Sequence, residues 1–136
     1  MRSTALQERT KSFALRVIKM CAALPRNDVS SVICRQLLRS ATSVGANYRS
    51  ACRARSQNDF VAKMALVEEE ADESAYWLEL LMESAQVRPA RVSALHREAG
   101  ELTALAAASR KTARSRSLQR PGNTIRHSTF DIRHSS

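Results

Sequence analysis

Apolar residues recur at helical spacing along most of the chain, with short polar breaks between the repeats. From about Thr4 to Leu24, at roughly 100° per residue, one stripe holds Leu6, Phe13, Val17, Met20, Cys21 and Leu24. Pro25 ends this segment because proline disfavours helical backbone in the residue before it. The pattern predicts a first helix over residues 4–24.

The second segment, residues 29–55, has two opposite faces. Its apolar stripe consists of Val29, Ile33, Leu37, Ala41, Val44, Tyr48 and Ala51. On the other side, within an arc of about 80°, lie Arg35, Arg39, Arg49 and Arg53. No Asp or Glu occurs in this segment, whereas a typical surface helix interleaves both charges. We expect a second helix, capped by Asn27 or Asp28, whose arginine row faces an anionic partner.

Two further segments carry seams in which the spacing alternates between 4 and 3. The third helix follows a capping sequence at 56–59, and its seam consists of Phe60, Met64, Val67, Ala71, Ser74, Leu78, Leu81 and Ala85. Pro89 suits the first turn of a fourth helix, whose seam consists of Val92, Leu95, Ala99, Leu102, Ala106, Ser109 and Ala113. Because short connections force neighbouring helices to run antiparallel, the predicted fold is all-α, an up-down-up-down four-helix bundle.

Length and composition agree with one helical domain. The chain has 136 residues with only three Gly and three Pro, so it is long enough for one helical core and poor in turn-forming residues. After Ala113 the sequence becomes rich in Ser and Arg, and Pro121 with Gly122 breaks any helical period. We predict a bundle domain over residues 1–113 and a flexible basic tail over 114–136.

Charge is distributed in blocks along the chain. The formal net charge is +9, and Lys plus Arg outnumber Asp plus Glu by 11 to 2 in residues 1–56 and by 10 to 3 in residues 87–136. Residues 57–86 contain 1 base and 8 acids. This layout fits nucleic-acid binding by the basic segments, or mutual neutralisation of basic and acidic helices. The residual positive charge favours an external polyanion.

The cysteines and the N-terminal segment indicate an intracellular protein. Cys21, Cys34 and Cys52 form no CxxC pair and lie within helical patterns, so each is interpreted as a reduced thiol. Arg16 and Lys19 interrupt the segment where a signal peptide would be apolar, and no apolar run reaches membrane-spanning length. We expect a cytoplasmic protein without membrane contact.

Three strings carry a resemblance to a known family: QLLRSATSVGANYRSACRARS at 36–56, DFVAKMALVEEEADESAYWLELL at 59–81 and ELTALAAASRKTAR at 101–114. Over roughly residues 5–115 the chain resembles the bacterial four-helix bundle proteins first described as open reading frames in intervening sequences of 23S ribosomal RNA genes. Where the usual family motif has a small polar or acidic residue after GANY, this chain has Arg49 and Ser50, which adds basic charge without breaking the pattern.

The resemblance implies a non-enzymatic, oligomeric protein associated with nucleic acid. The family is similar to the accessory variability determinants of diversity-generating retroelements, which form ring-shaped homopentamers whose basic surface binds nucleic acid and contacts a reverse transcriptase. By this resemblance we expect a homopentamer and consider a reverse transcriptase as a partner, an inference by analogy. The sequence leaves open whether the gene lies in a ribosomal RNA intervening sequence or serves a retroelement.

The third predicted helix carries a second apolar arc away from its seam, formed by Leu66, Tyr76, Trp77 and Leu80. A monomer would expose this arc, and Trp and Tyr are typical anchors of interfaces, so we predict a subunit contact there. Packing against the fourth helix or the tail, and a ligand surface, are the alternatives.

Three residues in the second predicted helix have specific interpretations. Gly45 costs roughly 1 kcal/mol against alanine in a helix interior, which favours close approach of a neighbouring helix over a backbone contact to a ligand. Asn47 is interpreted as a hydrogen-bond donor between helices. Tyr48 is interpreted as a core residue with a hydrogen-bonded hydroxyl.

No residues form a catalytic or metal-binding pattern in the sequence. The acidic run at 68–73 lacks the ExxH pairs of di-iron bundles, and His96 is the only histidine within the predicted bundle. We interpret these acids as solvated or paired with the arginines, and expect Glu70 to be partly buried beside a base. No serine lies in a GxSxG elbow and no cysteine has a placed histidine, so no enzyme activity, cofactor or metal is predicted.

Two functional hypotheses remain. In the leading one, an oligomeric bundle binds RNA or DNA, mostly independently of sequence and assisted by the tail, through phosphate contacts from Arg35, Arg39, Arg49 and Arg53. In the alternative, the protein is a protein–protein adaptor whose arginine row meets the acidic third helix of a neighbouring or foreign subunit. A continuous basic groove would favour the first hypothesis, and an arginine row covered by Asp and Glu would favour the second.

Overall fold

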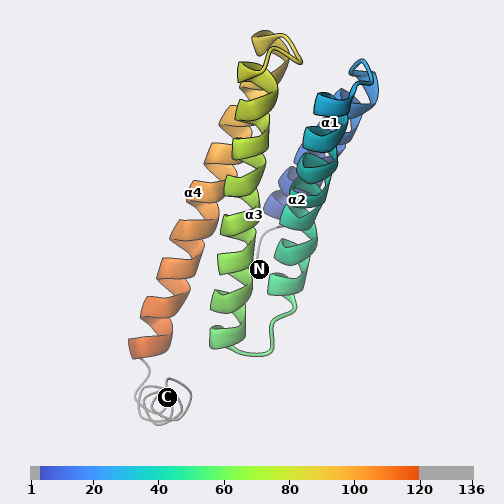
Figure 1. Cartoon of the computed structure of the whole chain (residues 1–136). Coiled ribbons are helices and arrows are strands. Elements are labelled where there is room, and N and C mark those ends of the chain that lie inside the picture. The colour runs from blue at the N-terminus through green and yellow to red at the C-terminus, as the bar shows by residue number, and fades with distance from the viewer. Residues whose placement is uncertain (1–3, 120–136) are drawn as a thin grey trace, which may run out of the picture.

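The computed structural model of the protein describes residues 4–119. It contains, within that range, four helices: α1 (Thr4–Ala23), α2 (Asp28–Cys52), α3 (Gln57–Glu83) and α4 (Pro89–Gln119). Figure 1 shows that successive helices alternate in direction, with the α1–α2 and α3–α4 connections at one end and the α2–α3 connection at the other. The predicted all-α, up-down-up-down four-helix bundle is confirmed.

The predicted seams form the core. The largest fully buried hydrophobic side chains come from all four helices: Phe13, Val17, Leu37, Val44, Met64, Leu78, Leu81, Val92 and Leu102. Leu6 and Cys21 are partly buried at the edge of this core, and Ser109 of the fourth seam is also only partly buried. Helical periodicity alone therefore identified most of the interior.

Two predicted core positions are wrong. Val29 is 49% exposed because Ser30 turns inward in its place, where the Ser30 hydroxyl donates a hydrogen bond to the Pro25 carbonyl (2.9 Å). Ala85 is exposed and lies beyond the end of α3 with a φ of 60°, in the left-handed region. Its N–H donates to the Met82 carbonyl, a bond of the kind that ends helices, so Ala85 belongs to a helix stop instead of the seam.

The helix starts follow their capping residues. Asn27, one of the two predicted caps of α2, accepts a hydrogen bond from the Ser30 N–H (2.9 Å). Ser56 caps α3 by accepting from the Asp59 N–H (3.0 Å), as the capping sequence at 56–59 predicted. Each side-chain oxygen satisfies an N–H that has no partner within the helix.

The helix ends differ from the prediction. The second helix stops at Cys52 instead of near Arg55, so the last three predicted residues belong to the connection to α3. The fourth helix continues to Gln119, so residues 114–119 are helical and the predicted boundary after Ala113 is wrong. Ser117 is buried in this extension, and its hydroxyl lies 3.3 Å from Asn58 Oδ1 on α3. Residues 120–136 of the predicted tail lie outside the described residues.

Helices α1 and α2 approach each other closely at Gly45. A Cβ atom at this position would lie 3.3 Å from Thr10 Oγ1, so the predicted close approach is confirmed. Tyr48 is buried, as predicted. Asn47 instead donates to the Ser43 carbonyl of its own helix (2.9 Å), so its predicted role between helices is wrong.

Helix α3 packs against α2 and against α4 more extensively than α1 packs against α2 or α4. Across the α1–α4 boundary, Arg9 forms ion pairs with Glu98 (Nε to Oε2, 2.7 Å) and Glu101 (Nη2 to Oε1, 2.5 Å). Between α2 and α3, the buried Ser74 hydroxyl lies 3.0 Å from the Ser40 hydroxyl. This contact fixes the register of α2 against α3, which decides the surroundings of the arginines described next.

Candidate nucleic-acid interface

The four arginines predicted to bind nucleic acid are all exposed, but they do not share one environment. A helix rises about 1.5 Å per residue, so Arg35 and Arg53 lie about 27 Å apart along α2. The side chains around them divide the row into an N-terminal pair, Arg35 and Arg39, and a C-terminal pair, Arg49 and Arg53.

Arg39 is paired with acids of the same chain. Its guanidinium forms ion pairs with Glu70 (Nη1 to Oε1, 3.4 Å) and with Glu73, both on α3. Glu70 is partly buried and paired with a base, as predicted. The two carboxylates offset the charge of Arg39 within the subunit.

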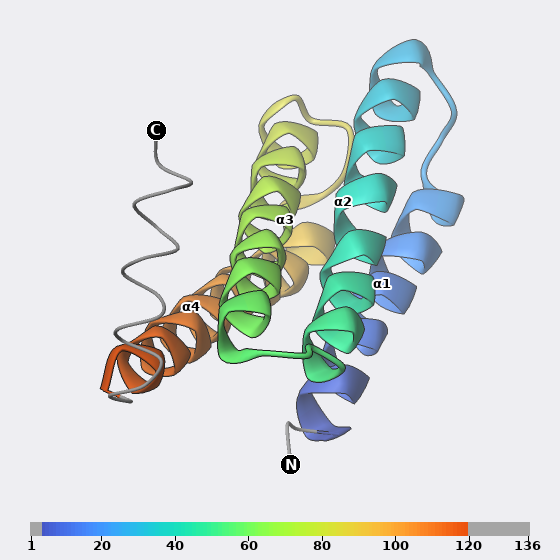
Figure 2. The ribbon, with the colours of Figure 1, turned by 90° about the horizontal axis from the view of Figure 1, so that it is seen from below.

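The C-terminal pair lies beside a hollow of about 480 Å³ at the end of the bundle where α2 connects to α3. Figure 2 looks onto this end of the molecule. The lining residues are Ala46, Arg49, Ser50, Arg53, Arg55, Asp59 and Lys63. Within residues 4–119 no carboxylate lies in ion-pair distance of Arg49, Arg53 or Arg55. Three arginines therefore line one hollow without an ion pair to a described residue.

A second hollow, of about 350 Å³, continues this surface between α1 and α2. Its lining residues are Gln7, Lys11, Ala14, Thr42, Gly45, Ala46 and Arg49. Ala46 and Arg49 line both hollows, so the two adjoin each other. We call the surface formed by Lys11, Arg49, Arg53, Arg55 and Lys63 the basic strip.

Asp59 is the acid that lines the first hollow. Lys63 Nζ lies 2.9 Å from both of its carboxylate oxygens, and the Arg55 backbone N–H lies 3.3 Å from one of them. The hydrogen bond from Lys63 is the main cause that lowers the pKa of Asp59. Asp59 is thus ionised at neutral pH and offsets Lys63, which leaves the arginines and Lys11 as the excess charge of the basic strip.

Lys11, Arg55 and Lys63 were not identified from the sequence as part of the site. They come from α1, from the α2–α3 connection and from α3, and only folding brings them beside Arg49. One signal was present in the sequence: the cap at Ser56 fixes a short connection, so basic residues on either side of it must lie near the end of the second helix.

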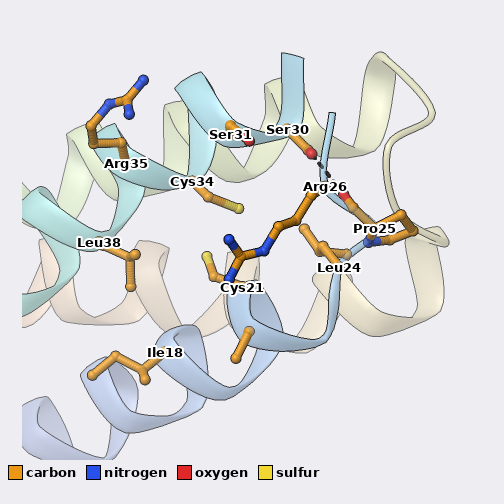
Figure 3. A pocket seen from close by; sticks show the side chains of 11 residues that line it. Ile18, Cys21, Leu24, Pro25, Arg26, Ser30, Ser31, Cys34, Arg35 and Leu38 are labelled. Atoms are coloured by element: carbon orange, nitrogen blue, oxygen red, sulfur yellow. Dashed lines mark hydrogen bonds between the residues drawn. The ribbon is translucent and has the colours of Figure 1, made fainter. Parts of the chain in front are cut away.

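Arg35 lies at the opposite end of α2, beside a third hollow of about 380 Å³ between α1 and α2. Arg26, Cys21 and Cys34 also line this hollow, and Figure 3 shows it from close by. Arg35 shares no lining residue with the basic strip. The structure therefore separates Arg35 from Arg49 and Arg53 instead of joining all four in one continuous row.

The apolar arc predicted as a subunit contact is only partly exposed. Leu66 is 44% and Tyr76 is 53% exposed, whereas Trp77 and Leu80 are partly buried against the core. The Trp77 indole N–H donates to Glu73 Oε2 (2.9 Å), and the Tyr76 and Trp77 rings lie edge to face with centroids 5.0 Å apart. The expectation that a monomer exposes the whole arc is wrong for Trp77 and Leu80, and the subunit contact itself stays a prediction.

Two further acids of α3 form pairs with residues of α4. Glu68 pairs with Arg110 (2.8 Å), and Glu79 lies 2.8 Å from His96 Nε2. Among the described residues, no group of three His, Cys, Asp or Glu side chains is arranged to hold a metal ion. No helix in this part of the chain is long and apolar enough to cross a membrane.

A family model and a solved structure relate the chain to the same kind of protein. A sequence model of the 23S rRNA-intervening sequence protein family matches residues 2–108. The fold is similar to the crystal structure of a protein with unknown function from the S23 ribosomal protein family of Bacteroides thetaiotaomicron, with a TM-score of 0.72 and 31% sequence identity. That similarity covers 77% of this chain and 97% of the other. No curated protein matches the chain.

Proposed function

Because the chain belongs to the 23S rRNA-intervening sequence protein family, we propose that it is a non-enzymatic, oligomeric protein that binds the phosphate backbone of RNA or DNA at the basic strip. The observation that carries this proposal is the convergence of Arg49, Arg53 and Arg55 on one hollow, with no described carboxylate in ion-pair distance. Guanidinium groups are strong, often bidentate, donors to phosphate oxygens.

The geometry of the basic strip favours backbone contacts over base reading. Arg49 and Arg53 are one helical turn apart, about 6 Å along α2, so both side chains reach the same stretch of a nucleic-acid backbone. The residues that line the two hollows include no aromatic side chain on which a base would stack. Binding is therefore mostly independent of sequence.

The sequence placed Arg39 among the phosphate-binding arginines, but in this proposal Arg39 does not belong to the binding surface. Its contacts with Glu70 and Glu73 would have to break before it could contact a phosphate. Arg35 faces a separate hollow. The binding surface we propose is thus the C-terminal half of the predicted arginine row, extended by Lys11, Arg55 and Lys63.

We further propose that the protein acts as a cytoplasmic homo-oligomer. Leu66 and Tyr76 are exposed apolar residues on α3 and are candidates for the contact between subunits. A homopentamer, and contact with a reverse transcriptase, are what the resemblance to retroelement accessory proteins implies. A ring of subunits would bring several basic strips onto one nucleic acid, which raises the apparent affinity.

The alternative function is a protein–protein adaptor. The contacts of Arg39 with Glu70 and Glu73 favour it, because they indicate that bases of α2 and acids of α3 fit one another. Glu69 and Asp72 are exposed on α3 and would be available to a basic strip on another subunit. In that case the basic strip would be covered in the oligomer.

The proposal is tested by measuring fluorescence anisotropy of labelled single-stranded RNA and of duplex DNA over a range of salt concentrations, with polyglutamate as a competitor of similar charge. We expect both nucleic acids to bind, with affinities that fall steeply as salt rises, because bound cations displace counterions from the phosphates. Light scattering in the same buffers should give a constant oligomer mass. Absence of binding to both nucleic acids, together with dissociation of the oligomer by salt, would support the adaptor instead.

A further inference from the structure

Two cysteines face each other across the α1–α2 connection. Cys21 lies in the last part of α1, and Cys34 lies in the second turn of α2. Both are free thiols, and both line the hollow between the end of α1 and the start of α2. Figure 3 shows both sulfur atoms directed into the space between the two helices. From this placement we propose that Cys21 and Cys34 are a redox-active dithiol that closes to an intramolecular disulfide joining α1 to α2.

The local fold holds the two thiols in place. Pro25 ends α1, and the Ser30 hydroxyl donates to its carbonyl (2.9 Å), a bond drawn in Figure 3. The cap of Asn27 on the Ser30 N–H fixes the start of α2 just beyond. This short, capped connection holds the end of α1 beside the start of α2, so both cysteines stay in the same hollow.

An oxidant has access to the pair. Cys21 is half-buried and Cys34 is 8% exposed, and both line the hollow of about 380 Å³ beside Arg26 and Arg35. Within residues 4–119 no third ligand completes a metal cluster with them. Two adjacent thiols in an open hollow are suited to disulfide exchange.

The reaction is a thiol–disulfide exchange with a low-molecular-weight disulfide such as glutathione disulfide. One cysteine thiolate attacks a sulfur of the disulfide, a mixed disulfide forms, and one glutathione thiolate leaves. The second cysteine, after losing its proton, attacks the protein sulfur of the mixed disulfide and releases the second glutathione. The two cysteines lose two protons and two electrons, and glutathione disulfide is reduced to two glutathione molecules.

The rate of this reaction should depend on pH. Burial, and then the hydrogen bond with Cys34, raise the pKa of the Cys21 thiol. The thiolate is the attacking species, so its fraction is small at neutral pH and grows as the pH rises. We expect slow oxidation at neutral pH and faster oxidation in mildly alkaline buffer.

Cys52 provides a matched control within the chain. It is also a free, partly buried thiol, but it lies at the other end of α2, about 27 Å along the helix from Cys34. The variant Cys52→Ser should form the same internal disulfide as the unchanged protein. The variants Cys21→Ser and Cys34→Ser should form none, and each should take up glutathione at the cysteine that is left.

The test is to incubate the full chain and these variants with glutathione disulfide and then to map disulfides by mass spectrometry of peptides. We expect a Cys21–Cys34 cross-link and a rise in melting temperature of about 5–15 °C, because the bond closes a short loop of the unfolded chain. Dithiothreitol should reverse both. Mixed disulfides with glutathione at both Cys21 and Cys34, or a cross-link through Cys52, would overturn the proposal. Since Cys52→Ser keeps both members of the pair, the result does not depend on whether Cys34→Ser folds.

Discussion

The two halves of α2 carry the same number of predicted arginines but lie opposite different parts of α3. In the N-terminal half, Arg39 meets Glu70 and Glu73. In the C-terminal half, Arg49 and Arg53 line a hollow near the start of α3, where Asp59 is already paired with Lys63. One helix thus carries an arginine that is neutralised within the chain, Arg39, and a C-terminal pair of arginines without such a partner among the described residues.

The register of the α2–α3 hairpin produces this difference. Because the helices are antiparallel and Ser40 lies beside Ser74, the acidic run at 68–73 lies next to the middle of α2. The C-terminal end of α2 lies next to the first turns of α3, which contribute Lys63. An arginine row that looks uniform in sequence is therefore divided by its neighbour, and charge on a helical wheel does not by itself identify a binding surface.

Reversal of two charges in the basic strip should have the largest effect. The variant Arg49→Glu/Arg53→Glu loses two phosphate contacts, which alone should weaken nucleic-acid binding about 25- to 60-fold at 0.1 M salt. Repulsion between the new carboxylates and the phosphates adds to this loss. Anisotropy with labelled single-stranded RNA measures it. The matched control, Arg26→Glu/Arg35→Glu, makes the same change of charge beside the other hollow and should weaken binding less than about fivefold. Equal losses in the two variants would mean that the halves of α2 do not differ in function.

Removal of the charge of Arg55, which only the structure placed in the basic strip, should have a smaller effect on nucleic-acid binding. Arg55→Gln should weaken binding about 5- to 8-fold at 0.1 M salt, the amount expected for one phosphate contact. Arg35→Gln is the control and should leave the affinity nearly unchanged. If Arg55→Gln binds as tightly as the unchanged protein, Arg55 does not belong to the part of the basic strip that contacts nucleic acid.

The stability of the fold, unlike nucleic-acid binding, should depend on an arginine in the N-terminal half of α2. Arg39→Gln leaves Glu70 and Glu73 without their base and should lower the free energy of unfolding by about 0.5–1 kcal/mol, the range for ion pairs that are partly exposed. Arg49→Gln removes no ion pair and should change stability by less than about 0.5 kcal/mol. Urea denaturation of both variants measures the difference, and a greater loss in Arg49→Gln would show an internal role for that residue.

Much of the fold was predictable because helical period and stop residues are local. Pro25, the cap at Ser56 and the seams of α3 and α4 placed the helices, and Gly45 indicated the close approach of a neighbouring helix, which the structure identifies as α1. One error arose where a residue one position away took the buried place, as Ser30 did for Val29, and others lay at the helix ends, as at Ala85 and beyond Ala113.

The site was less predictable because it depends on which residues fold opposite one another. The helical period placed Arg39 and Arg49 on one face, but it contains no information on the register between α2 and α3. Neither the pairing of Arg39 with α3 nor the approach of Lys11 and Lys63 to Arg49 follows from one helix alone. Long-range packing decides both.

The central claim, that the C-terminal half of α2 binds phosphate and the N-terminal half does not, is tested most directly by the salt dependence of binding. The two variants to compare are Arg49→Gln/Arg53→Gln and Arg35→Gln/Arg39→Gln, which remove the same charge from one helix. For the first, the slope of log affinity against log salt should become shallower by about 1.4 on single strands and 1.8 on duplex DNA. For the second, the slope should stay that of the unchanged protein. Light scattering should give the same oligomer mass for both. An unchanged slope in Arg49→Gln/Arg53→Gln with an intact oligomer would contradict phosphate contact at the basic strip.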